Sequence, residues 1–178
     1  MSSINWLMWR YWYFSSGGYL TGGSGVTGGG ADSGGIDNEA VKNAYNKTLE
    51  ALLKRDTCKI ELQNLSMGGE YSDPAGILKQ IYGRNSIKLG TRSEAPIGAG
   101  SKAKISLDKD LFNHNSLALS MGMSYLTNDL ETAQAVEILH ELSHPTGKFS
   151  HPGFSKVKGT KVIGPQGLNQ KIYQACFG

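Results

Sequence analysis

The first clear hydrophobic pattern in the chain is a helical repeat over 37–55. Its apolar positions are Val41, Tyr45, Leu49 and Leu52. Asp37 stands at the start of this repeat, and its carboxylate is a favourable N-cap. We therefore predict an amphipathic helix that begins after Asp37 and runs to about Arg55. A second, shorter helix is predicted from Asp73 to Gly83, because an Asp-Pro pair begins helices well and glycine often ends them.

Alternating apolar and polar positions, which are typical of half-buried strands, occur in three short stretches. These stretches are 57–62, 86–89 and 103–108. In the last stretch Ala103, Ile105 and Leu107 face one way, and polar residues face the other. In the first stretch the expected apolar side is Cys58, Ile60 and Leu62.

A third helical pattern is apolar around much of its circumference, which is typical of a buried, central helix. Its apolar residues are Ala133, Ala135, Val136, Ile138, Leu139 and Leu142. Asn128 is the expected N-cap, with Glu131 completing a capping box. The helix is predicted over 129–144, because Pro145 stops it. Together the elements predict an α+β domain, in which a small twisted sheet packs on this central helix and the helix at 37–55 lies behind it.

The end of the central helix carries the sequence His140-Glu141-Leu142-Ser143-His144, which has the form H-E-x-x-H. Positions i and i+4 of a helix lie on one face, so His140 and His144 can bind the same tetrahedral Zn2+ ion. Glu141 would lie beside that ion without binding it. There it can act as general base toward a water whose pKa zinc lowers to about 7. The alternative interpretation is a polar helix end whose two histidines are simply solvated.

A catalytic zinc ion usually has three protein ligands and one open position. The chain contains no Asp and no Glu after Glu141, so a downstream carboxylate is excluded as the third ligand. We expect His151 to be that ligand, because it follows a glycine-containing turn shortly after His144. The alternatives are an upstream Asp, His114 and Cys176.

Composition places this chain among globular proteins with an N-terminal extension, since 39% of its 178 residues are hydrophobic. Residues 1–16 are rich in aromatic side chains, but Arg10 lies inside the apolar run, so they do not form a clear signal peptide. We expect them to be an interfacial anchor or the remnant of a preceding domain. Residues 17–36 are rich in Gly and Ser and predict a flexible linker. The domain itself is expected to cover 37–178.

A net charge of +3 is too small to indicate nucleic-acid binding. No apolar run approaches the roughly 20 residues that a transmembrane helix needs. The two cysteines, Cys58 and Cys176, can form one disulfide or remain two buried thiols, and their spacing fits no C-x-x-C motif.

The segment from Leu139 to His144 resembles the active-site helix of zincin metallopeptidases. Its extension to Gly147 is similar to that of the metzincin group, which continues with a third histidine. In this chain Ser150 stands at that place, and His151 follows it. The resemblance implies a zincin-like fold built around the active-site helix. It also implies that the strand at 103–108 is a sheet edge along which an extended substrate can pair.

The strand at 104–107, followed by the H-E-x-x-H helix, also resembles the layout of aspzincins, although their downstream Asp motif is absent. Residues 103–178 are more similar to small metallopeptidase domains at the C-terminal ends of bacterial polymorphic toxins. Those domains share a closing segment of the form Asn169-x-x-Ile172-x-x-x-Cys176. This resemblance implies a hydrolase that is secreted or delivered to a target cell. It also implies an immunity or inhibitor protein as a partner.

The function expected from the motif is zinc-dependent hydrolysis of peptide bonds in a protein or peptide substrate. An alternative is a zinc amidase that acts on cell-wall peptides, because the motif defines the water chemistry and not the substrate. A further alternative is a non-catalytic, zinc-stabilised binding domain. An oxyanion partner should also exist, and the candidates are Tyr125, Tyr173 and His114.

Overall fold

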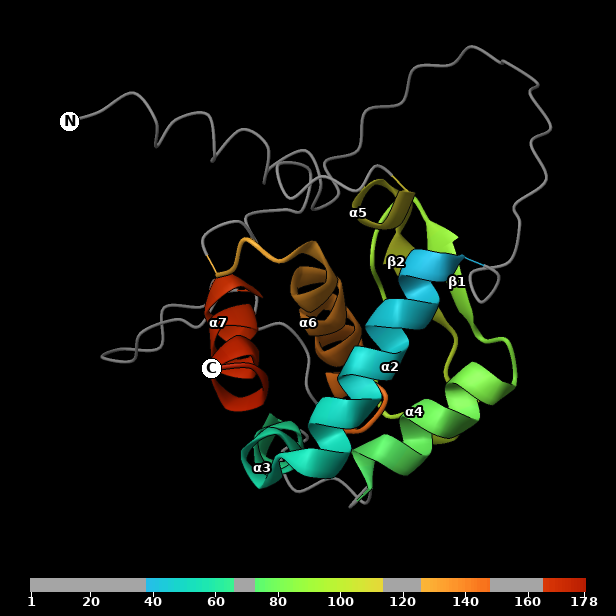
Figure 1. Cartoon of the computed structure of the whole chain (residues 1–178). Helices are drawn as coiled ribbons and strands as arrows, with labels where there is room; N and C mark the ends of the chain where they lie inside the picture. The colour runs from blue at the N-terminus through green and yellow to red at the C-terminus, as the bar shows by residue number, and fades with distance from the viewer. Residues whose placement is uncertain (1–37, 66–72, 114–125, 148–164) are drawn as a thin grey trace, which may run out of the picture. The chain divides into compact units, whose positions relative to one another are not determined.

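The computed structural model describes residues 38–65, 73–113, 126–147 and 165–178. In chain order its elements are α2 (Glu39–Lys54), α3 (Asp56–Leu65), α4 (Pro74–Gly83), β1 (Ile87–Gly90), the 3-10 helix η2 (Gly100–Lys102), β2 (Ile105–Asp108), α5 (Lys109–Asn113), α6 (Leu130–Ser143) and α7 (Pro165–Cys176) (Figure 1). The two strands form one small parallel sheet, so the predicted α+β class is correct. None of the described helices is long and apolar enough to cross a membrane. The predicted segments 1–16 and 17–36 lie outside the described residues.

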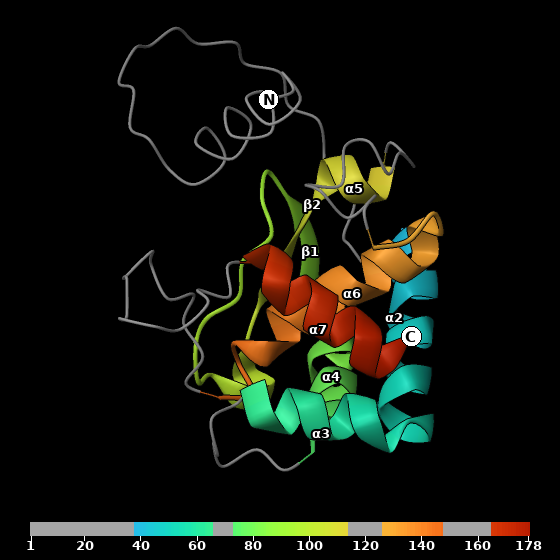
Figure 2. The same ribbon diagram turned by 90° about the vertical axis from the view of Figure 1, so that its left-hand side faces the viewer.

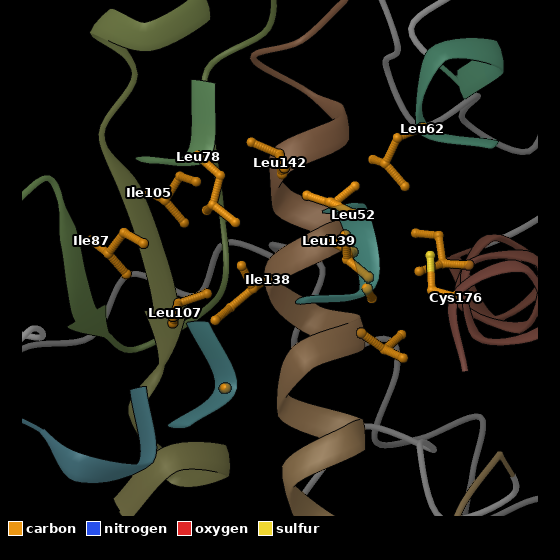
Figure 3. Packing of buried hydrophobic residues seen from close by; sticks show 14 of the residues in the cluster. Leu52, Leu62, Leu78, Ile87, Ile105, Leu107, Ile138, Leu139, Leu142 and Cys176 are labelled. Carbon is orange, nitrogen blue, oxygen red and sulfur yellow. The ribbon is translucent and has the colours of Figure 1, made fainter. Parts of the chain in front are cut away.

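Helix α6 packs against α2, α7 and β2, as the apolar pattern of the predicted central helix indicated. Figure 3 shows buried apolar side chains on both sides of this helix. Ile138 is directed toward Leu107 on β2, whereas Leu139 lies on the other side of the helix, toward α7. All three side chains are fully buried. The helix that carries the H-E-x-x-H sequence is therefore held by the hydrophobic core on more than one side.

The N-cap of α6 is Asp129, one residue later than the predicted Asn128. The Asp129 carboxylate accepts hydrogen bonds from the backbone N–H of Glu131, at 3.2 Å, and from the Thr132 hydroxyl. It also forms an ion pair with Lys47 of α2, at 2.6 Å. Both Asn and Asp are good caps, so the prediction of Asn128 depended on the capping-box position of Glu131. The contact with α2 is a tertiary feature that stabilises the cap at Asp129.

The N-cap of α2 is also one residue later than predicted. Asn38, and not Asp37, accepts the backbone N–H of Val41 through its side chain, at 3.2 Å. The helix itself is confirmed, and its buried residues are Val41, Ala44, Thr48, Ala51 and Leu52. Helix α4 agrees with its prediction at both ends, since Asp73 accepts the Gly76 N–H at 3.0 Å and Gly83 is the last helical residue.

The strand predicted at 57–62 is wrong, because these residues belong to helix α3. Cys58 and Leu62 are buried, as predicted, but Ile60 is 53% exposed. A run of six residues is too short to separate an alternating pattern from a helical one. In the folded chain, Cys58 and Leu62 lie one turn apart on the helix face that meets the core.

The strands predicted at 86–89 and 103–108 correspond to β1 and β2, which pair in parallel with Ile87 opposite Ile105. Ile105 and Leu107 are buried, as the alternation predicted. The expectation of an open edge along β2 is wrong at Ser106. Its N–H donates to the Glu94 carbonyl at 2.9 Å, and its carbonyl accepts the Glu94 N–H at 3.0 Å. The edge of β2 that does not face β1 is thus already paired at this position.

Candidate metal centre

Helix α6 brings together the side chains of His140, Glu141 and His144 at its C-terminal end. One ligand atom from each residue lies within 4.8 Å of the others. The two imidazole rings stand edge to face, with centroids 5.5 Å apart. The three residues are only 5%, 4% and 5% exposed, respectively. The arrangement agrees with the sequence prediction that these side chains share one helix face.

Asn169 of α7 is the hydrogen-bond partner of the first histidine. Its side-chain oxygen lies 2.6 Å from His140 Nδ1, and both residues are buried. Figure 2 shows α7 lying across α6, which is how a residue 29 positions further along the chain reaches this ring. The sequence analysis did not identify Asn169 as a site residue. The available signal in the sequence was its place in the segment Asn169-x-x-Ile172-x-x-x-Cys176.

Glu137 lies on the same stripe of α6 as the three clustered side chains. With Glu137 at position i, His140, Glu141 and His144 follow at i+3, i+4 and i+7, which lie on one side of a helix. The Ser93 hydroxyl hydrogen-bonds to the Glu137 carboxylate and accepts the Asp108 N–H at 2.9 Å. Burial raises the pKa of Glu137, while the Ser93 hydrogen bond and the nearby His144 oppose that rise. Sequence reasoning missed this residue, although its helical spacing was visible.

The electrostatics of the cluster favour neutral side chains. Burial lowers the pKa of His140 to about 4, partly opposed by the Asn169 hydrogen bond, and the charge of His144 lowers it further. Burial also raises the pKa of Glu141 well above its usual value, and repulsion from Glu137 and Glu94 adds to this rise. Neutral imidazole is the form of histidine that binds a metal ion, so His140 is ready to do so at neutral pH.

One oxygen of the Glu141 carboxylate, Oε2, is buried without a hydrogen-bond partner among the described residues. Leaving a buried polar atom unsatisfied costs about 1–3 kcal/mol. Such an atom is expected where a ligand, water or metal ion completes the site. Two imidazoles beside a carboxylate form a donor set suited to zinc and to other divalent first-row metals. The residues present therefore fit a metal ion.

The end of α6 is held by the chain that precedes β2. The Gly98 N–H donates to the His144 carbonyl at 2.9 Å, and the Gly100 N–H donates to the Pro145 carbonyl at 2.9 Å. Gly98 and Gly100 have φ values of 68° and 55°, in the left-handed region that glycine adopts most readily. These contacts fix the backbone at His144, where the helix ends.

The remaining predicted site residues have different outcomes. His151, the expected third ligand, lies outside the described residues, as do His114 and Tyr125. Tyr173 is on α7, one turn after Asn169, and its ring lies beside Phe177 with centroids 6.5 Å apart.

Cys176 forms a disulfide with Cys58, which decides between the two states that the sequence left open. A sulfur atom in a disulfide has no thiolate to offer a metal ion. Cys176 is therefore excluded as the third ligand in this structure.

Comparisons with protein-family models, with curated proteins and with solved structures found no match for this chain. The chemistry of the cluster is therefore inferred from its own geometry.

Proposed function

We propose that this protein is a zinc-dependent hydrolase of peptide bonds, with His140 and His144 as metal ligands and Glu141 as the general base. The observation that supports this most directly is the buried cluster of the three side chains on one turn of α6. The Glu141 oxygen without a partner adds to it, because a carboxylate needed only for packing or stability would be expected to be satisfied.

Each residue has a distinct role in this proposal. A bound Zn2+ ion would supply Lewis acidity and lower the pKa of a water molecule to about 7. His140 and His144 would hold the ion, and His151 is proposed as the third ligand. Glu141 would accept a proton from the attacking water and donate it to the leaving amine. Burial raises its pKa, and raising the pKa of a carboxyl group toward the working pH improves its ability both to take and to give a proton.

The disulfide bears on where the protein works. Disulfides persist in oxidising environments and are rare in the cytosol. The Cys58–Cys176 bond therefore supports the proposal that the protein is secreted or delivered to a target cell. A protein or peptide substrate and an immunity or inhibitor protein are the partners proposed with it.

The test combines metal content with activity on several substrates. Wild-type protein should bind one equivalent of zinc and cleave casein, and chelation should abolish cleavage. Glu141→Gln should retain the metal and lose activity by about 100-fold or more, the range expected for a general base. Glu131→Gln is the matched control, because it makes the same change at an exposed position of the same helix. Cleavage of peptidoglycan fragments but not casein would instead indicate the cell-wall amidase.

The deep burial of the cluster also fits a second function, in which the metal ion only stabilises the fold. In that case wild-type protein would bind zinc, cleave no substrate and unfold on chelation. Glu141→Gln would then change neither activity nor metal content. The absence of zinc after reconstitution would contradict both functions.

A further inference from the structure

We propose that Asn169 is a positioning residue of the metal centre, which holds His140 in a single tautomer and ring orientation with Nε2 as the metal-binding atom. This inference rests on the proposed metal-binding function. It goes further by assigning the atom of His140 that binds the metal and the residue on α7 that selects it.

The first step of the argument is the chemistry of the hydrogen bond. The Asn169 side-chain oxygen can only accept a hydrogen bond, and it lies 2.6 Å from His140 Nδ1. Nδ1 must therefore carry the proton. A neutral imidazole with a proton on Nδ1 keeps its lone pair on Nε2. The contact thus leaves Nε2 as the nitrogen that can bind a metal ion.

The second step is that Asn169 itself has little freedom to move. It is 8% exposed, and its neighbours Leu168 and Ile172 on α7 are buried in the core. The C-terminal end of α7 is tied to α3 by the Cys58–Cys176 disulfide and by a 2.7 Å hydrogen bond from the Thr57 hydroxyl to the Ala175 carbonyl. A partner fixed in this way restricts the rotation of the His140 ring as well as its tautomer.

The third step concerns the choice of an amide rather than a carboxylate. Histidine ligands of metals commonly donate their second N–H to a carboxylate, a carbonyl oxygen or water. This cluster already contains the acidic side chain of Glu141, and Glu137 lies on the same stripe of the helix. The Asn169 amide accepts the hydrogen bond from His140 Nδ1–H without adding an ionisable group to a buried site.

The experiment measures the tautomer and the metal affinity separately. Nitrogen-15 NMR of the metal-free wild type should show His140 protonated on Nδ1 alone. Asn169→Leu keeps the side chain similar in size but removes the acceptor, so the ring should then populate both tautomers. The same variant should weaken binding of Zn2+, measured by competition with a chelator, by about 10- to 100-fold. The visible spectrum of the Co2+-loaded protein should change as well.

Two further variants make the test decisive. Asn169→Asp keeps an acceptor oxygen at this position, so it should keep the Nδ1 proton and bind Zn2+ more tightly than Asn169→Leu does. Gln170→Leu is the control on the exposed side of α7 and should change neither measurement.

The inference is overturned if wild-type His140 carries its proton on Nε2, or if Asn169→Asp weakens binding as much as Asn169→Leu. It is also overturned if the Zn2+ affinity of Asn169→Leu is within about twofold of the wild-type affinity, because removing the hydrogen-bond partner of a metal-binding histidine normally weakens binding much more. If the wild type binds no zinc at all, the proposed function fails. The tautomer measurement still tests Asn169 in that case.

Discussion

Helix α6 has two buried faces whose chemistry differs completely. One is a wide apolar sector that carries Ile138, Leu139 and Leu142 and packs into the hydrophobic core toward both β2 and α7 (Figure 3). The other carries His140 and Glu141, which are almost as deeply buried but are polar and ionisable. Burial of the apolar side chains contributes stability, at about 1.5–3 kcal/mol for each large side chain. Burial of the polar ones costs free energy unless every polar atom finds a partner.

Because the two faces differ in chemistry, their burial has different explanations. The apolar face accounts for why α6 has its position in the fold. The polar face is not explained by stability, because Glu141 Oε2 has no partner among the described residues. Groups of this kind are characteristic of functional sites, where a ligand supplies the missing interaction. The following predictions test whether the two faces behave as differently as their chemistry indicates.

The largest effect is expected from removing the disulfide that anchors α7 beside the polar face. The bond closes a loop with a sequence separation of 118, and replacing both cysteines by serine should lower the free energy of unfolding by about 4 kcal/mol. Chemical denaturation measures this loss. Hydrogen exchange should become faster in α7, which the disulfide holds, than in α2, which carries neither cysteine. Equal acceleration in both helices would contradict a specific role of the disulfide in anchoring α7.

The next effect tests the apolar face directly. Leu139→Ala removes a fully buried side chain and leaves a cavity, so it should lower the free energy of unfolding by about 3 kcal/mol. Leu53→Ala makes the same change at a position of α2 that is 60% exposed, and it should cost less than about 0.5 kcal/mol. Urea denaturation of both variants provides the comparison. Similar losses would mean that Leu139 is not part of the core.

A substitution on the polar face is expected to have a smaller effect, and to raise the free energy of unfolding instead of lowering it. The pKa of Glu141 is raised in the folded protein, so its carboxyl group favours folding at low pH. This contribution is lost as the pH rises through the raised pKa and the buried group ionises. Glu141→Gln removes that ionisation and should stabilise the metal-free protein by about 1–2 kcal/mol at pH 8.

Wild-type protein and Glu141→Gln should have equal stability at about pH 4, below the ordinary Glu pKa of 4.5, because the carboxyl group then keeps most of its protons in the folded and unfolded chains alike. Thermal denaturation at both pH values measures the difference, and Glu131→Gln serves again as the exposed control. A lower stability of Glu141→Gln at pH 8 would show that the carboxylate is satisfied in the metal-free protein.

The smallest effect concerns the start of α6, which both faces share. Asp129→Ala removes the N-cap and should cost about 1 kcal/mol. Asn128→Ala should cost much less, although the sequence pattern favoured Asn128. Denaturation midpoints of the two variants decide which residue caps the helix. A larger loss of stability in Asn128→Ala than in Asp129→Ala would mean that Asn128 is the N-cap, as the sequence pattern predicted.

The successes and failures of the sequence predictions follow from the range of the interactions involved. The helix over 129–144 was predictable because its apolar repeat and Pro145 act within a few residues. His140 and His144 were predictable as neighbours for the same reason, since helical spacing alone places them on one face. The strand predicted at 57–62 failed because so short a pattern fits two periods. In the folded chain this segment is helix α3, which packs against α7 and α2.

The sequence by itself determined which side chains share the stripe on α6, because a helix fixes the directions of residues one turn apart through local backbone geometry. Only the tertiary structure decided that Asn169 meets His140 and that Cys58 pairs with Cys176. Those contacts join residues on different helices, whose relative placement depends on how the whole core packs. The same packing buries Glu141 and changes its pKa. Burial is a property of the surroundings and not of the residue.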